Sequence, residues 1–356
     1  MKLIYFLGIL VCAATALPLE ENHANGEEGW YVPQADGSFV WMSTEEGEEL
    51  LEELEKNEIE DEEMSVDDDD ETDILSSVTV PVHFYLYTNE NPKKSQKIKD
   101  SAKSLKKSNF DPNNPTRFII HGWIQNQKAH MNSNIRDALL SRGDYNIIVV
   151  DWSRARSVDY ATSVSAVRPT GKKVAKIIDY LVENHGLDLH TTEVIGHSLG
   201  AHVAGYAGKN IGTGKLHAII GLDPALPLFS YSKPKKRLSM DDAEYVETIH
   251  TNGGNLGFLK PIGKGAFYPN GGKKQPGCGW DVTGACSHGR SCEYYAEAVA
   301  ANSFISVRCG DYEGAVKDSC GNQYSGVRMG SATNAYVVAG EFYVPVHNAT
   351  PYGFGL

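Results

Sequence analysis

The chain has 356 residues, of which 41% are hydrophobic and 10% aromatic, so it can bury a sizeable core in one large domain or two small ones. This composition excludes a chain that is disordered throughout, a collagen-like chain and a small disulfide scaffold. The net charge of −13 is unevenly distributed. Residues 17–73 contain 23 Asp and Glu but one Lys, whereas the chain from residue 74 onward is basic, at about +8.

The first residues follow the pattern of a secretory signal peptide. Lys2 precedes the apolar run 3–11, and an Ala-x-Ala cleavage pattern follows at 14–16. The run is too short to span a bilayer, and no other stretch approaches 18 apolar residues. We therefore expect residues 1–16 to be removed, no transmembrane segment, and a soluble, extracellular mature protein.

The acidic segment that follows, residues 17–73, has two interpretations. It contains too few apolar residues to offset the entropy of ordering, which predicts a disordered tail. The alternative is a propeptide that lies over the basic body. This alternative rests on three leucines that fit a short helix and four aromatic residues that can dock on a surface: Leu50, Leu51, Leu54, Trp30, Tyr31, Phe39 and Trp41.

From residue 78 onward, short apolar strands alternate with helical patterns. We expect strands within 78–87, 117–120, 147–150, 194–195 and 217–222, and helices over 167–182, ending near Gly186, and 199–211. This alternation predicts an α/β fold with a mostly parallel central sheet flanked by helices. Residues 74–356 are expected to form one domain.

The motif with the clearest chemistry is Gly196-His197-Ser198-Leu199-Gly200, a G-x-S-x-G sequence between a predicted strand and a predicted helix. This is the context of a nucleophile elbow, a sharp turn that exposes a serine hydroxyl at the start of a helix. The helix N-terminus behind Ser198 also favours the negative charge that develops during acyl transfer. Ser198 is therefore the candidate nucleophile.

A nucleophilic serine needs a histidine base and a carboxylate that orients it, in the chain order Ser, Asp/Glu, His. Asp223 fits the acid because it ends a predicted strand; Asp241, Asp242 and Asp281 are rivals without a preceding strand. His288 fits the base, in a loop just before the helix that includes residues 294–299. His250, at the end of the strand-like run 246–249, is the rival base, although strand-end histidines are more often packed and hydrogen-bonded.

The site also needs two N–H donors for the oxyanion. One is the backbone N–H of Leu199, directly after the nucleophile. The other is expected from the loop His121-Gly122-Trp123, which follows an early strand, through the Trp123 N–H.

Five cysteines remain after the signal peptide, and an oxidising compartment favours their pairing. We expect Cys278–Cys286 and Cys309–Cys320, because each pair closes a short loop, and Cys292 is left over. Asn348 begins a glycosylation sequon, weakened by Pro351.

These motifs together resemble the animal pancreatic-lipase family, a group of secreted α/β-hydrolase lipases and phospholipases A1. The resemblance covers most of residues 78–322 and includes 196–202, 121–123, 221–225, 249–254, 267–272 and 286–288. It implies an α/β-hydrolase fold and hydrolysis of carboxylic esters of lipids. It also implies Ser198 as nucleophile, Asp223 as acid, His288 as base, and Trp123 and Leu199 as oxyanion donors.

Three departures from the family pattern point to a short-lid type similar to insect digestive lipases. Only 68 residues follow His288, too few for the C-terminal β-sandwich domain of the full lipases. The loop between Cys278 and Cys286, which includes Trp280, is short for a lid. In 234–243, Pro234 and Ser239 stand where the family's calcium loop would have carboxylates, so neither calcium nor another metal or cofactor is expected.

We therefore expect an extracellular enzyme, of the gut lumen for example, that hydrolyses triacylglycerol or phospholipid at a lipid interface. The short lid predicts an open site and weak interfacial activation. Nucleic acid and a colipase-type partner are not expected. Two alternatives remain: a catalytically silent lipid-binding or yolk-type protein of the same fold, and an esterase of dissolved esters.

Overall fold

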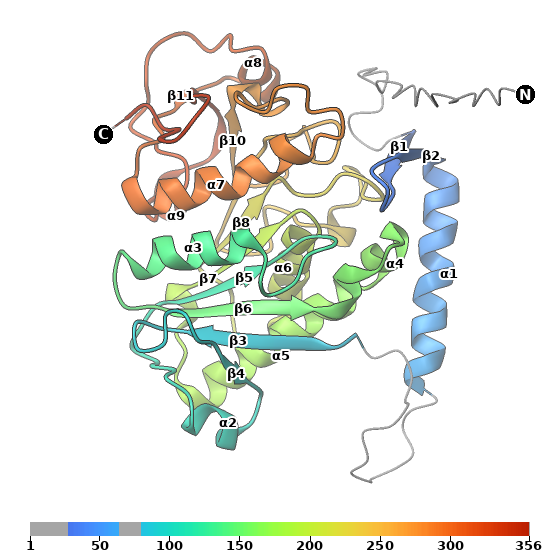
Figure 1. Ribbon diagram of the computed structural model, residues 1–356, viewed down its shortest axis with the longest axis vertical. Helices are drawn as coiled ribbons and strands as arrows, with labels where there is room; N and C mark the ends of the chain where they lie inside the picture. The colour runs from blue at the N-terminus through green and yellow to red at the C-terminus, as the bar shows by residue number, and fades with distance from the viewer. Residues whose placement is uncertain (1–27, 64–79, 356) are drawn as a thin grey trace, which may run out of the picture.

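The structure, a computed structural model, describes residues 28–63 and 80–355 (Figure 1). The expected signal peptide, residues 1–16, lies outside these ranges. The strands are β1 (Gly29–Pro33), β2 (Phe39–Ser43), β3 (Val82–Tyr87), β4 (Gln96–Ile98), β5 (Thr116–Ile120), β6 (Asn146–Trp152), β7 (Thr192–His197), β8 (Ala218–Leu222), β9 (Tyr245–Ile249), β10 (Gly265–Pro269), β11 (Val307–Arg308) and β12 (Gly340–Val344). The α-helices are α1 (Thr44–Glu63), α2 (Ala102–Lys106), α3 (His130–Leu140), α4 (Tyr160–Ser165), α5 (Val167–His185), α6 (Leu199–Asn210), α7 (Ala285–Ala301), α8 (Tyr312–Val316) and α9 (Asn334–Val337).

Ten strands form one sheet in the order β11-β12-β10-β9-β8-β7-β5-β6-β3-β4. The seven central strands from β12 to β6 pair in parallel, and β3, β4 and β11 are antiparallel at the edges. This sheet with its covering helices confirms the predicted α/β-hydrolase fold. All five strands expected from the sequence are present.

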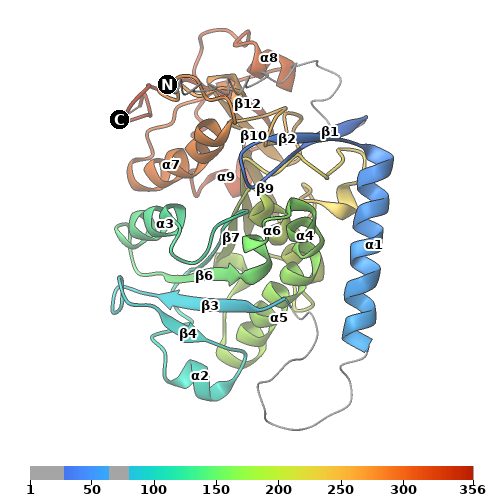
Figure 2. The same cartoon turned by 45° about the vertical axis from the view of Figure 1, so that its right-hand side comes forward.

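Helices cover both faces of the sheet, with α5 and α6 on one side and α3 and α7 on the other (Figures 1 and 2). Successive residues of a strand point to opposite faces, so Phe118 and Ile120 of β5 join the core under α5 and α6, and Ile119 joins the core under α3 and α7. The predicted end of α5 is confirmed: Gly186 adopts φ 73° after its last turn, a backbone conformation that suits glycine.

The acidic N-terminal segment is not the disordered tail that its composition predicts, at least over residues 28–63. β1 and β2 form an antiparallel hairpin, and α1 runs from it along the outside of the body (Figure 1). The reason is that its few apolar side chains are concentrated on one surface: Trp30 and Val32 are buried in the main core, and Leu50, Leu51 and Leu54 pack against it.

Both predicted disulfides, Cys278–Cys286 and Cys309–Cys320, are formed, and Cys292 is unpaired and buried. Burial also raises the pKa of the Cys292 thiol, so this cysteine remains protonated near neutral pH.

Within residues 28–63 and 80–355, no helix is long and apolar enough to cross a membrane. Asn348 is exposed, as a glycosylation acceptor must be; its modification remains a prediction.

Candidate active site

Ser198 occupies a sharp turn between β7 and α6, where it adopts φ 56° and ψ −123°. The flanking glycines make this turn possible. A Cβ atom on Gly196 would lie 2.2 Å from the Gly200 carbonyl oxygen, and one on Gly200 would lie 2.3 Å from the Ile120 carbonyl oxygen. The turn therefore presents the Ser198 side chain at the carboxyl edge of the sheet, as the G-x-S-x-G pattern predicts.

The loop after β5 passes directly beside this serine. A Cβ atom on Gly122 would lie 2.9 Å from the Ser198 Cβ, so only glycine allows the loop to come this close. The Trp123 indole fixes the loop by donating to the Ser157 carbonyl oxygen at 2.8 Å and by packing on Tyr160. Leu199 is the first residue of α6, a position whose N–H has no partner within the helix. Both expected oxyanion donors are thus carried by segments next to Ser198.

Asp223 follows β8 and is fully buried. Its Oδ1 accepts hydrogen bonds from the backbone N–H groups of Thr251 (2.7 Å) and Asn252 (3.0 Å), which fix its orientation. Its Oδ2 lies 2.6 Å from Nδ1 of His288. A Cβ atom on Gly257 would lie 2.5 Å from both carboxylate oxygens, so this glycine leaves the space that Asp223 fills. A single glycine outside the motifs gave no sequence signal for this role.

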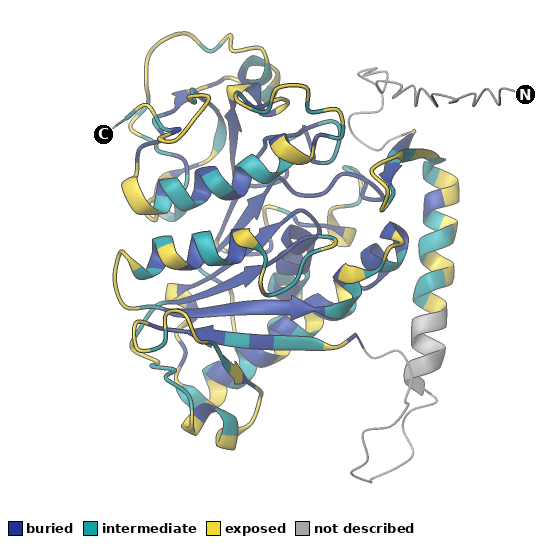
Figure 3. Ribbon diagram, in the orientation of Figure 1, coloured by how far each residue is buried: buried dark blue, intermediate teal, exposed yellow. Residues whose placement is uncertain are grey.

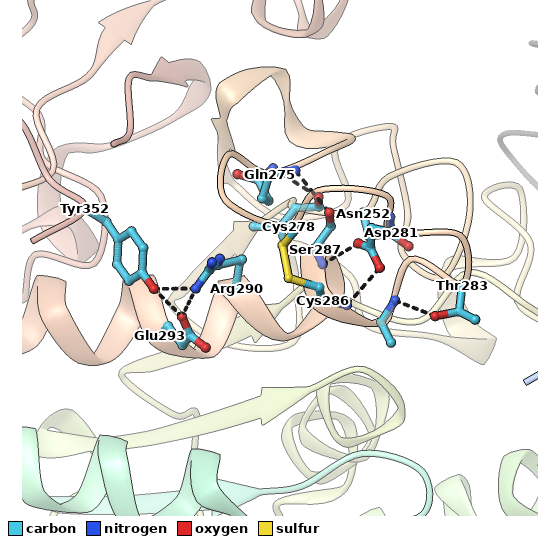
Figure 4. The surroundings of a disulfide bond; sticks show 12 residues. Asn252, Gln275, Cys278, Asp281, Thr283, Cys286, Ser287, Arg290, Glu293 and Tyr352 are labelled. Atoms are coloured by element: carbon cyan, nitrogen blue, oxygen red, sulfur yellow. Dashed lines mark hydrogen bonds and ion pairs between the residues drawn. A yellow bond between two sulfur atoms is a disulfide. The ribbon is translucent and has the colours of Figure 1, made fainter. Parts of the chain in front are cut away.

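His288 lies in the first turn of α7 rather than in a loop before it, which corrects the sequence-based prediction. Asp281 explains the early start of the helix, because its carboxylate accepts from the Cys286 (3.1 Å) and Ser287 (2.7 Å) N–H groups (Figure 4). These N–H groups have no partner within the helix, so a side-chain acceptor extends α7 back to Ala285. The disulfide and Asp281 together set the position of His288.

A second histidine, His197, lies beside the first. The two rings have centroids 4.5 Å apart, and His197 Nε2 is 3.3 Å from the His288 carbonyl oxygen. Burial, and to a lesser degree the charge that His288 can carry, lower the pKa of His197 well below its ordinary value. A neutral His197 adds no positive charge next to His288. Sequence reasoning did not assign His197 this position, although it lies within the elbow motif.

The other candidates for the acid and the base do not contact Ser198 or His288 through the hydrogen bonds that the structure shows. Asp241 is exposed, Asp281 caps α7, and His250 is buried between Thr248 (2.9 Å) and the Phe258 carbonyl oxygen (2.7 Å). Asp242 pairs with the Lys209 ammonium at 2.5 Å, and Lys209 also donates to the Arg237 carbonyl oxygen at 2.8 Å. The cluster of Cys278, Asp281 and Cys286 has ligand-type atoms, but its two sulfurs form a disulfide.

Because Lys209 already supplies a cation to Asp242, we expect that a chelator changes neither activity nor stability. Dialysis against EDTA should shift the thermal unfolding midpoint by less than about 1 °C, since no ion is removed from this site. Lys209→Met serves as a positive control: it leaves a buried carboxylate unpaired, which should cost about 3–5 kcal/mol. A lower midpoint in EDTA that calcium restores in the unaltered chain would contradict the prediction.

Ser198 and His288 line one cavity of about 340 Å³, with apolar walls from Trp123, Tyr160 and Leu256. Residues 33–35 and 37–39 at the hairpin tip also line this cavity, as does Thr283 of the Cys278–Cys286 loop. The prediction of an open site considered only the disulfide loop, whereas the N-terminal hairpin also borders this cavity. The disulfide loop is as short as predicted, and its Trp280 is 98% exposed; the N-terminal hairpin is a second segment beside the cavity.

Comparison with known proteins identifies the family of the chain. A family model described as Lipase matches residues 50–352. The chain is 36% identical to human pancreatic triacylglycerol lipase over 264 residues and 35% identical to coypu (Myocastor coypus) pancreatic lipase-related protein 2 over 270 residues. These matches cover 68% and 69% of this chain but 57% of each relative. Among solved structures, Est1E from Butyrivibrio proteoclasticus matches 41% of this chain and 47% of its own, at 16% identity and a TM-score of 0.26.

Proposed function

Because the chain belongs to the Lipase family, we propose that it is a carboxylic ester hydrolase that cleaves the acyl esters of glycerolipids. The observation that carries the proposal is the 2.6 Å contact between Asp223 and His288 at a cavity that Ser198 also lines. We assign Ser198 as nucleophile, His288 as base, Asp223 as the orienting acid, and the Trp123 and Leu199 N–H groups as oxyanion donors.

In this mechanism Asp223 holds the proton of His288 on Nδ1, which leaves Nε2 free to accept the Ser198 proton. The Ser198 oxygen attacks the ester carbonyl carbon, and the Trp123 and Leu199 N–H groups stabilise the resulting oxyanion. His288 then returns the proton to the leaving alcohol. A water molecule then attacks the acyl carbon while His288 takes its proton, and His288 passes that proton to the Ser198 oxygen as the acyl–oxygen bond breaks and the fatty acid leaves.

We propose that phospholipids, cleaved at the sn-1 ester, are substrates beside triacylglycerol. The support is the disulfide loop, which encloses only residues 279–285 and leaves room for a polar head group once the hairpin is aside. Trp280, Val282 and Ile124 are exposed apolar side chains on segments next to the cavity, and they fit contact with a lipid surface. Secretion, with removal of residues 1–16, belongs to the same proposal and is supported by the two disulfides.

Fatty-acid release from three substrates tests this proposal: a dissolved short-chain ester, emulsified triacylglycerol, and phosphatidylcholine labelled in its sn-1 chain. We expect turnover of the dissolved ester and release of the sn-1 chain, both lost in Ser198→Ala. Release from triacylglycerol alone would favour a strict triacylglycerol lipase. Turnover of the dissolved ester alone would favour an esterase of soluble substrates, and no turnover of any ester would favour the silent lipid-binding alternative.

A further inference from the structure

The N-terminal hairpin and helix lie against the surface that borders the candidate active site. At the tip of the hairpin, residues 33–35 and 37–39 form part of the wall of the cavity that Ser198 and His288 also line. A Cβ atom on Gly37 would lie 3.9 Å from the Thr283 methyl group, so the tip reaches the Cys278–Cys286 loop. Two segments that are far apart in the sequence therefore meet beside this cavity.

Specific contacts fix this segment to the body. Trp30 is 2% exposed, and its indole N–H donates to the Phe229 carbonyl oxygen at 3.0 Å. Gly47 lets α1 approach closely, because a Cβ atom there would lie 2.7 Å from the Trp30 ring and 2.9 Å from Leu228. These contacts hold the hairpin against Leu228 and Phe229, in the loop that follows β8 and Asp223.

Charge complementarity accompanies these contacts. Glu48 forms an ion pair with Lys233. Glu52 and Glu55 of α1 line a small cavity between the helix and the body together with Arg168 and Lys236. The outer face of α1 is exposed over residues 44–56 (Figure 3). The negative charge of this segment is therefore complementary to the positive charge of the body. An anionic lipid surface would be attracted to the same positive charge.

The ten-stranded sheet contains no strand of this segment. β1 and β2 pair only with each other, whereas the ten-stranded sheet is built entirely from β3 to β12. The segment adds no side chain to the hydrogen bonds that hold Asp223 and His288. Its position at the cavity mouth, rather than a part in the sheet, distinguishes it from the rest of the fold.

We propose that residues 28–56, here called the cover, are an autoinhibitory segment. The cover closes the active-site cavity to lipid substrates, and its displacement or removal activates the enzyme. This inference rests on the proposed ester hydrolase function. Small dissolved esters fit through a narrow opening, whereas lipid substrates do not. The ratio of dissolved-ester turnover to lipid turnover should therefore be much higher for the intact chain than for the uncovered enzyme.

The first test weakens the cover at its buried anchor. Trp30→Ala removes the indole that fills the interface, so the open form becomes more populated and hydrolysis of phosphatidylcholine vesicles should rise at least about 10-fold. Trp41→Ala is the matched control, because Trp41 lies in the same hairpin but is 39% exposed. We expect it to leave the rate within about 2-fold. Equal rates for folded Trp30→Ala and the unaltered chain would overturn the proposal.

A charge exchange provides a second variant set that does not depend on a core residue. Glu48→Lys and Lys233→Glu each place like charges together and should raise phosphatidylcholine hydrolysis about 2- to 5-fold. The double variant restores the pair with its signs reversed and should return the rate to the starting value. Activation that persists in the double variant would show that the two residues act separately and not through the docking of the cover.

The third test severs the cover from the intact, folded protein. A recognition sequence for a site-specific protease replaces residues 66–71, between the cover and the body. After cleavage only noncovalent contacts hold the cover, so dilution to nanomolar concentration should release it and activate hydrolysis of phosphatidylcholine. Gel filtration reports whether the fragment has left. If the remaining protein has lost the fragment but still cleaves phosphatidylcholine at the starting rate, the proposal that the cover is autoinhibitory is refuted.

The dissolved short-chain ester separates failure of this inference from failure of the proposed function. If no form of the protein, covered or uncovered, hydrolyses any ester, the proposed function is wrong. If every form hydrolyses both substrates at unchanged rates, the enzyme proposal stands and the cover is refuted. The expected result is a rise on phosphatidylcholine with a change of less than about 3-fold on the dissolved ester.

Discussion

Replacement of Ser198 by alanine is expected to lower ester hydrolysis by a factor of about 10⁶, because the reaction loses its nucleophile. That factor corresponds to about 8 kcal/mol of transition-state stabilisation. The fold should persist. Alanine meets the same backbone cost at φ 56° as serine, and the hydrogen bond from the Ser198 N–H to the Leu222 carbonyl oxygen (3.0 Å) does not involve the side chain.

The measurement is the initial rate on a dissolved ester, alongside the thermal unfolding midpoint and the yield of purified protein. A phosphonate that labels nucleophilic serines should modify the unaltered chain and not the variant. Ser163 provides a control, because it is a buried serine that donates to the Arg154 carbonyl oxygen at 2.7 Å, away from His288. Ser163→Ala should keep its turnover, and near-normal turnover in Ser198→Ala would remove Ser198 from the mechanism.

The sequence predicted the site best where one local segment carries both the pattern of its secondary structure and the catalytic residue. The strand before Gly196 and the helix after Ser198 follow from apolar periodicity, and the elbow between them requires glycines on both sides. Asp223 could be chosen over Asp241 because only Asp223 ends a strand. Parallel strands bring such carboxyl-terminal positions to one edge of the sheet, so distant residues in the sequence became candidates for one site.

The sequence was less informative where tertiary contacts outweigh local composition. The acidic content of residues 17–73 predicts disorder, yet Trp30 and the leucines of α1 are buried or partly buried against the body, which one segment's sequence does not reveal. The start of α7 depends on Asp281, five residues before Cys286, so His288 was expected in a loop. The space for Asp223 depends on Gly257, whose role follows only from a close approach in three dimensions.

Asp223→Asn is expected to lower turnover by a factor of about 10⁴ with little change in stability. Asparagine tolerates φ 42°, and its amide oxygen can still accept from the Thr251 and Asn252 N–H groups. Its NH₂ group, however, would face His288 Nδ1, where a carboxylate oxygen now lies at 2.6 Å. Because the amide donates, Nδ1 must accept, and the His288 proton moves to Nε2, which then cannot take a proton from Ser198.

This reversal of the His288 tautomer distinguishes Asp223 from a residue that merely supports the fold. The rate loss should appear in kcat for a dissolved ester and diminish at high pH, where hydroxide bypasses the base. Asp241→Asn is the matched control, since Asp241 is exposed and should change the rate by less than about 2-fold. A large loss in Asp241→Asn with normal turnover in Asp223→Asn would show that Asp223 is not the catalytic acid. Such a result would leave the 2.6 Å contact with His288 without a catalytic role.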